Sequence, residues 1–177
     1  MWRRSDGVLD DVRARSREGG SHQAPGQGAS YYELIFRQTM DGVPISSHGY
    51  ANRDDPREYH TADTFVRAVI EEPCMSMLSG TELLAPERAG EPMPVVSYEQ
   101  AFEQVRRHYA GKFRAYDNVL AEAELVYHKV KLRERDRFRL IPAWAFTIMA
   151  IAPYGRDINY YELCMIDAHT GEMYIAP

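Results

Sequence analysis

The C-terminal half of the chain alternates between apolar and polar positions, a pattern typical of β-strands. Residues 119–132 follow a period of two, residues 140–152 form a long apolar stretch, and residues 159–167 and 172–175 continue the pattern. Turn-forming residues separate these segments, and Gly171 suits a hairpin position with positive φ. The pattern therefore predicts three or four consecutive antiparallel strands.

A helix is predicted before these strands, over residues 97–111. Ser97 and Gln100 have the spacing of a capping box, in which the two side chains satisfy backbone N–H groups at the start of a helix. Gly111 is expected to end the helix. Apolar side chains recur at intervals of four, three and four and form one stripe: Tyr98, Phe102, Val105 and Tyr109. A helix laid across antiparallel strands predicts an α+β lobe over residues 96–177.

Residues 31–95 are expected to form a first lobe of shorter extended segments. An Asp41-Gly42 turn joins a strand over residues 31–37 to a second strand that begins at Val43. Residues 64–71 fit a third strand or a short helix, and residues 75–84 are expected to be extended or mixed. A linker rich in proline then separates the two lobes.

Residues 1–30 differ from the rest of the chain in composition. They contain the stretch GGSHQAPGQGAS, which cannot bury much apolar surface. Val8, Leu9 and Val12 fit one side of a short helix over residues 6–17. We therefore expect a frayed helix or a disordered arm.

Composition and charge exclude several classes of protein. With 45% apolar and 27% charged residues the chain is globular, and its net charge of −5 argues against a nucleic-acid-binding domain. No apolar segment is long enough to cross a bilayer, and the start has the charge but not the apolar core of a signal peptide. Cys74 and Cys164 are too few for a cysteine-rich scaffold; they form either one disulfide or two separate buried thiols, and the thiols are favoured.

The residues give no catalytic signature. The six histidines lack a zinc-type spacing, no Gly-x-Ser-x-Gly elbow is present, and no glycine-rich phosphate loop follows a strand. We therefore predict no catalytic residue, no cofactor and no metal. The alternative is a small ligand-binding protein or enzyme whose cleft lies between helix and sheet, lined by Tyr127, His128 or Trp144.

One segment is a candidate for partner binding. Residues 129–139 hold six basic residues against two acidic ones in an otherwise acidic chain. This segment is either a patch for an anionic partner or a solvated hairpin tip whose charges protect a sheet edge. The candidate partner-binding residues are Arg133, Arg135, Arg137 and Arg139.

Two groups of motifs resemble the PepSY and thermolysin-propeptide-like superfamily. The first is YELIFRQTMDGVPIS over residues 32–46: an aromatic strand, a Gln, an Asp-Gly turn and then Val-Pro. The second is the helix over residues 97–111 followed by LIPAW at residues 140–144 and IDAHTGE at residues 166–172. The resemblance spans residues 31–177. The same segments are also similar to YycH/YycI-type regulators and uncharacterised lipoproteins of Gram-positive bacteria.

The resemblance implies a fold and a role. The fold would be α+β, an antiparallel sheet with a packed helix, in two PepSY-like lobes. The role would be that of a non-enzymatic, extracytoplasmic or cell-surface domain that binds or restrains a protein partner, without nucleic acid. A membrane tether outside this chain is compatible with that role. These motifs are structural, so no catalytic residue is carried over.

Overall fold

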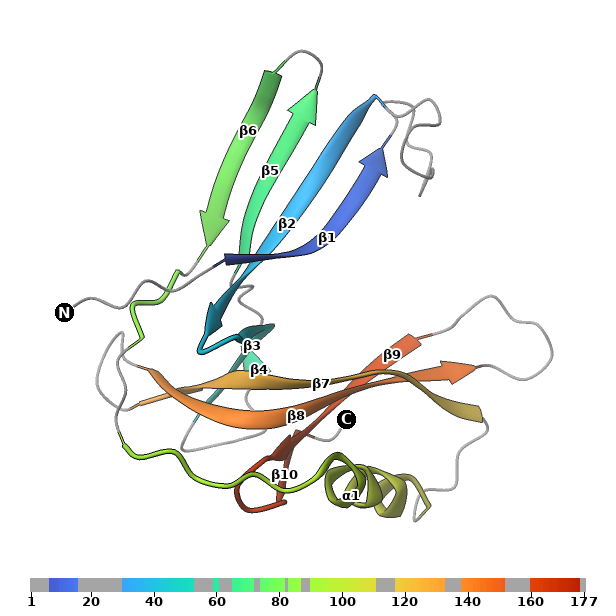
Figure 1. Cartoon of the computed structure of the whole chain (residues 1–177). Coiled ribbons are helices and arrows are strands. Elements are labelled where there is room, and N and C mark those ends of the chain that lie inside the picture. The colour runs from blue at the N-terminus through green and yellow to red at the C-terminus, as the bar shows by residue number, and fades with distance from the viewer. Residues whose placement is uncertain are drawn as a thin grey trace. The chain divides into compact units, whose positions relative to one another are not determined.

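The computed structural model divides the chain into two units, which are described separately (Figure 1). The structure describes residues 7–15, 30–52, 59–60, 65–71, 74–81, 83–86, 90–110, 117–132, 138–151 and 160–175. Unit 1 comprises Met1–Tyr50 and His60–Glu87, and unit 2 comprises Ala51–Tyr59 and Arg88–Pro177. Within the described residues there are ten strands and one helix.

Unit 1 is built on antiparallel strands around β2 (Tyr31–Met40). β1 (Gly7–Arg15) and β5 (Phe65–Glu71) pair with β2, and β6 (Cys74–Thr81) pairs with β5. β3 (Val43–Asn52) forms a hairpin with the end of β2, and the two-residue β4 (Tyr59–His60) spans the unit boundary.

The turn between β2 and β3 lies where the sequence predicts it. Asp41 has φ 52° and Gly42 has φ 80°, the backbone that Asp-Gly adopts in tight hairpins.

The expectation of a frayed helix near the N-terminus is wrong for residues 7–15, which form β1. Leu9 lies opposite Phe36 and Val12 lies opposite Leu34, with a register shift between Leu9 and Asp11. Three apolar residues at helical spacing are a weak local signal, and pairing with a long neighbouring strand outweighs it.

Unit 2 contains a four-stranded antiparallel sheet in the order β7-β8-β9-β10. The strands are β7 (Asp117–Lys131), β8 (Phe138–Ile151), β9 (Tyr160–Asp167) and β10 (Met173–Ile175). The period-two pattern and the long apolar stretch of the sequence are therefore strands, as predicted.

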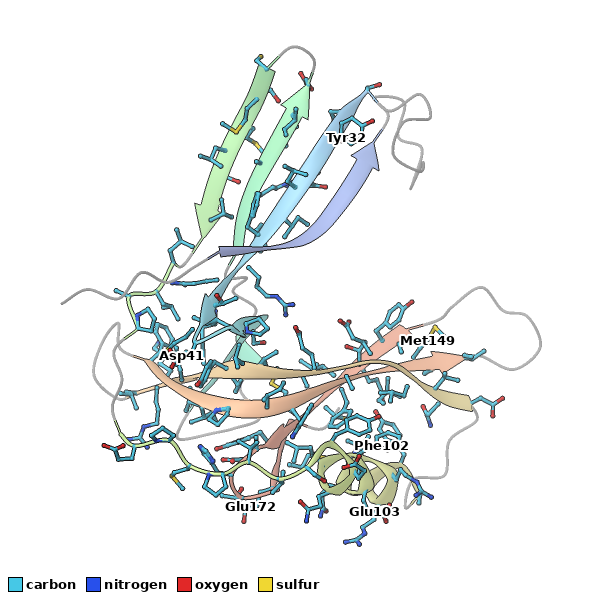
Figure 2. All side chains as sticks on the ribbon, in the orientation of Figure 1. Tyr32, Asp41, Phe102, Glu103, Met149 and Glu172 are labelled. Carbon is cyan, nitrogen blue, oxygen red and sulfur yellow. The ribbon has the colours of Figure 1, made fainter. Side chains whose placement is uncertain are left out.

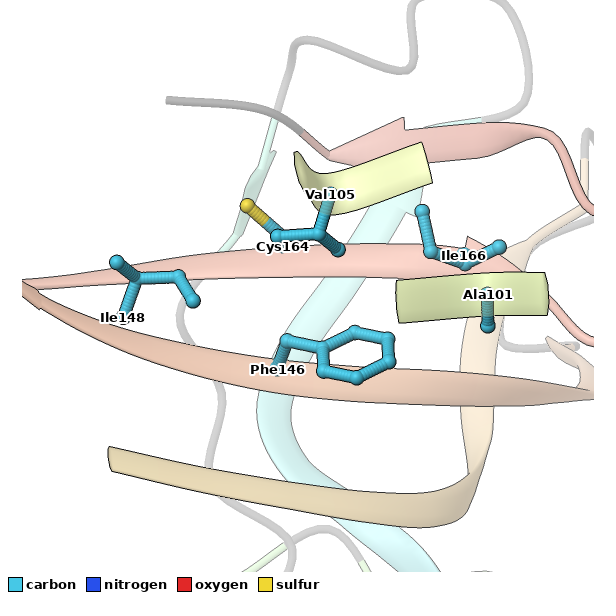
Figure 3. Close-up of a cluster of buried hydrophobic side chains, with 6 residues drawn as sticks. All are labelled: Ala101, Val105, Phe146, Ile148, Cys164 and Ile166. Atoms are coloured by element: carbon cyan, nitrogen blue, oxygen red, sulfur yellow. The ribbon is translucent and has the colours of Figure 1, made fainter. Parts of the chain in front are cut away.

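A single helix, α1 (Tyr98–Ala110), packs on one face of this sheet. Its capping box is present: Ser97 N–H donates to Gln100 Oε1 at 3.0 Å, and Gln100 N–H donates to Ser97 Oγ at 3.3 Å. The helix and sheet meet in a cluster of buried side chains drawn in Figure 3: Ala101, Val105, Phe146, Ile148, Cys164 and Ile166. The predicted helix and its apolar stripe are confirmed.

The predicted fold class is wrong. Strands dominate the described residues, and α1, 13 residues long, is their one helix, so the fold is closer to a sheet-dominated one than to a PepSY-like α+β fold. The difference arises mainly in unit 1. Residues 7–15, expected as an arm, form β1. The sequence predicts an extended or mixed segment over residues 75–84, and β6 occupies Cys74–Thr81 and extends the sheet.

Candidate functional site

Strand β6 is the candidate site because it ends the unit 1 sheet and leaves its side chains in solvent. Its inner side pairs with β5, and among the described residues no strand pairs with its outer side. Every side chain described on β6 is exposed, as the sticks drawn along this strand illustrate (Figure 2). Leu78 is 63% exposed, Met75 57% and Met77 41%.

Apolar side chains point from both faces of β6. Met77 lies opposite Val69 and Leu78 lies opposite Ala68, so the two side chains point to opposite faces of the sheet. Val69 and Ala68 are buried, whereas their neighbours on β6 are not. At this end of the sheet, the described side chains are therefore buried on β5 but not on β6.

The sequence of β6, CMSMLSGT, contains no charged residue and no proline. Edge strands are usually protected from pairing by lysine, proline or a bulge. β6 has a register shift opposite Val69 and Ile70, where Ser76 Oγ donates to the Val69 carbonyl at 3.3 Å. Beyond this shift, residues 77–81 stay in one-to-one register with residues 65–69, so the rest of the edge is regular.

Gln38 anchors the chain just beyond β6. Its side-chain Nε2 donates to the Leu84 carbonyl at 2.5 Å, and Leu84 N–H donates to Gln38 Oε1 at 3.0 Å. Gln38 is buried on β2, so one amide satisfies both backbone groups of Leu84. These two hydrogen bonds hold the segment after β6 against β2.

A second polar cluster lies in unit 2, around the carboxylate of Asp167. Asp167 Oδ1 accepts hydrogen bonds from His169 N–H at 2.6 Å and Thr170 N–H at 3.0 Å, and Oδ2 accepts one from Tyr174 Oη at 2.9 Å. Burial and the bond to Asp167 raise the pKa of Tyr174 to about 12. Gly171 closes the turn with φ 75°, as predicted. These bonds all hold the β9–β10 turn in place.

A third cluster joins the end of α1 to β9. Tyr109 Oη donates to Glu162 Oε2 at 2.6 Å and lies 3.6 Å from Cys164 Sγ. Burial, and then the bond to Glu162, raises the pKa of Tyr109 well above its usual range. Cys164 is buried, Cys74 is exposed, and no disulfide joins them. The sequence favours two separate buried thiols, and burial is confirmed for Cys164 and wrong for Cys74. These contacts of Tyr109 hold the end of α1 against β9.

The residues expected to line one cleft lie on two faces of the unit 2 sheet. Trp144 packs with the α1 cluster, and the register places Tyr127 on the same face. His128 follows Tyr127 in β7, so it points to the opposite face, where its ring lies 6.5 Å from that of Tyr174. The space between helix and sheet is filled by the buried cluster of Figure 3.

The basic segment is described only in part. Arg139 is exposed on β8, opposite Val130 of β7. Arg133, Arg135 and Arg137 lie outside the described residues. The partner-binding role of the four arginines stays a prediction.

The described residues also bear on two other classes of site. In that part of the chain, no group of three or more His, Cys, Asp or Glu side chains is arranged to hold a metal ion. None of its helices has the length and apolarity needed to traverse a bilayer.

Sequence reasoning did not identify β6 as a site. The available signal was an eight-residue stretch without charge in a chain in which 27% of residues are charged. That signal becomes informative only when the stretch is known to be the last strand of a sheet.

Comparisons with known proteins support the fold alone. No protein-family model matches the chain, and no curated protein matches it. A solved structure, the crystal structure of an uncharacterized protein from Eubacterium rectale ATCC 33656 at 1.45 Å resolution, is similar with a TM-score of 0.74 and 14% sequence identity. The match covers 98% of this chain and 51% of that one, so this chain spans about half the length of its structural neighbour.

Proposed function

We propose that this chain is a non-enzymatic protein-interaction or regulatory domain that acts outside the cytoplasm and binds its partner through β6. The observation that carries the proposal is the exposed, uncharged edge of β6, with Met75, Met77 and Leu78 in solvent. Apart from the register shift at Ser76, the edge carries none of the features that protect edge strands in monomeric proteins.

The chemistry of the edge supports a protein as the partner. A strand at the end of a sheet presents a row of backbone N–H and C=O groups, and another extended polypeptide satisfies that row by strand addition. Exposed thioether and leucine side chains add apolar contacts above and below the row. Methionine suits such a surface because its unbranched side chain adapts to different neighbours.

The regulatory role and the extracytoplasmic location are supported by the motif resemblance. The segments that carry it resemble those of propeptide inhibitors and histidine-kinase regulators: residues 32–46, 97–111, 140–144 and 166–172. These proteins act by binding or restraining another protein rather than by turning over a substrate.

Capture from the cell envelope tests the proposed interaction. The tagged 177-residue chain is compared with Met77→Lys/Leu78→Lys, which charges both faces of β6, and with Met93→Lys/Val95→Lys as a control. The control residues, at 63% and 44% exposed, match Leu78 and Met77, at 63% and 41%, but lie before α1 rather than on β6. We expect a protein that the wild type and the control retain and the β6 variant loses. Capture that does not depend on β6, together with turnover of a small substrate, would contradict the proposal.

Thiol labelling tests the location. Cys74 is exposed and Cys164 is buried, so a membrane-impermeant maleimide should label Cys74 in intact cells of the native host. Cys74→Ser should abolish the labelling. Labelling that appears only after lysis would place the chain in the cytoplasm.

A further inference from the structure

We infer that the strand paired with β6 belongs to a second copy of this chain, which docks β6 against β6 in antiparallel orientation across a two-fold axis. The inference rests on the proposed function, because it names the partner of the same edge. It follows from the symmetry of strand pairing, the order of side chains in β6 and the absence of charge along it.

Symmetry restricts how two copies of one strand can pair. An antiparallel pair related by a two-fold axis has that axis perpendicular to the sheet, so the axis leaves each side chain on the face where it began. Residues directly opposite each other in a sheet share a face. Therefore one residue of β6 must lie opposite itself, and its neighbours on one side lie opposite its neighbours on the other.

The order of side chains in β6 fits such pairing. The register shift at Ser76 places Met75 opposite Ile70, so Met75 lies on the other face from Met77, and residues 77–81 form the regular part of β6. Within this regular part, an axis at Leu78 places Met77 opposite Ser79 of the other copy, and an axis at Ser79 places Met77 opposite Thr81 and Leu78 opposite Gly80. In both registers each large side chain near the axis lies opposite a small residue or its own copy, so the apolar surfaces can pack without a clash.

Charge also favours a second copy. Across a two-fold axis a charged residue near the centre would lie opposite or diagonal to its own copy, and like charges at that distance repel. The chain carries 21 basic and 26 acidic residues, yet β6 carries none. A strand selected to bind a charged partner would need complementary charges, which this strand lacks.

The size of the contact sets the expected strength. Pairing along residues 77–81, with the exposed parts of Met77 and Leu78, buries less than roughly 1,000 Å² in total, which is the size of a weak interface. We therefore expect a dimer that forms in the micromolar range and dissociates on dilution.

Sedimentation velocity tests the dimer. The wild-type chain is measured from about 1 to about 100 µM, a range that brackets a micromolar dissociation constant. We expect the dimer fraction to rise with concentration, Met77→Lys/Leu78→Lys to weaken dimerisation at least about tenfold, and Met93→Lys/Val95→Lys to leave it unchanged. A wild type that stays monomeric throughout, or a dimer that the β6 variant retains, would overturn the inference.

A cysteine scan tests the axis without relying on the lysine variants. Single changes Ser76→Cys, Met77→Cys, Leu78→Cys and Ser79→Cys are made in the Cys74→Ser background and exposed to a mild oxidant. Opposed Cα atoms lie roughly 4.5–5.5 Å apart, within the range that a disulfide bridges, whereas copies of an off-axis residue lie farther apart. We expect one position to form a disulfide dimer far faster than the others. Equal rates at every position, or no disulfide, would be evidence against a two-fold pairing.

The two sets of experiments separate the inference from the proposed function. If the wild type is monomeric but the envelope capture still yields a protein lost only from the β6 variant, the partner is another protein and only the inference fails. If neither dimerisation nor capture depends on β6, both fail.

Discussion

Replacing Trp144 measures how strongly the segment before α1 is held to the sheet of unit 2. Trp144 lies half-buried on β8, and its ring meets that of Tyr98 edge-on, with centroids 5.8 Å apart and planes at 75°. Its Nε1–H donates to the Val96 carbonyl at 3.0 Å, in the extended segment that leads into the helix. The side chain thus combines packing with one hydrogen bond.

Two variants separate these contributions. A fully buried Trp→Ala change costs about 3–5 kcal/mol, so the half-buried Trp144→Ala should cost about 3 kcal/mol. Trp144→Phe keeps a ring against Tyr98 and loses the hydrogen bond, which gives an expected cost of about 1 kcal/mol. For a chain of this size each kcal/mol lowers Tm by about 2–4 °C, so the alanine variant should melt about 6–12 °C lower.

Urea unfolding followed by circular dichroism measures both costs. Tyr161→Ala serves as the control, because that side chain lies on β9 of the same sheet and is 65% exposed. The control should change stability by less than about 0.5 kcal/mol. A cost below about 1 kcal/mol for Trp144→Ala would show that its ring contributes no packing. Equal costs for alanine and phenylalanine would show that the hydrogen bond accounts for the whole effect.

Three further predictions concern the titration of Tyr174, the backbone at Gly171 and the arginines of the basic segment. Burial and the bond to Asp167 raise the pKa of Tyr174 from 10.0 to about 12. The stability that this shift contributes is therefore present below pH 10 and is lost as the pH rises towards 12. Tyr174→Phe should make the urea midpoint fall less between pH 10 and pH 12 than it does in the wild type. Gly171→Ala should cost about 1 kcal/mol because φ is 75°, whereas Gly90→Ala, with no atom within 4 Å of the added Cβ, should be nearly neutral in the same assay. If the basic segment is a solvated hairpin tip, replacing its four arginines together by serine should leave the unfolding midpoint nearly unchanged. Marked unfolding would contradict that interpretation. The residues replaced are Arg133, Arg135, Arg137 and Arg139.

Features fixed by contacts between near neighbours could be predicted from the sequence. The capping box joins residues three apart, and the turns at Asp41-Gly42 and Gly171 depend on backbone angles that these residues favour. The period of two in residues 119–132 is also local, and it correctly predicts β7.

Features that depend on distant partners could not be predicted. Residues 7–15 are a strand because β2 lies beside them, and nothing in their own order of residues specifies that neighbour. The exposure of β6 depends on its place at the end of the sheet, which a local pattern does not encode. The cleft alternative named Tyr127, His128 or Trp144, and the period of two already shows that Tyr127 and His128 lie on opposite faces of their strand.

The amide of Gln38 makes the end of β6 sensitive to one chemical change. Its nitrogen faces the Leu84 carbonyl and its oxygen faces the Leu84 N–H, an arrangement that no other acyclic side chain except asparagine reproduces. Deamidation would exchange the nitrogen for a second oxygen and set a negative charge against that carbonyl. The segment after β6 would then lose its hydrogen bonds to Gln38 of β2. Slow deamidation of this one glutamine would therefore destabilise the β6 edge of unit 1 and leave unit 2 unaffected.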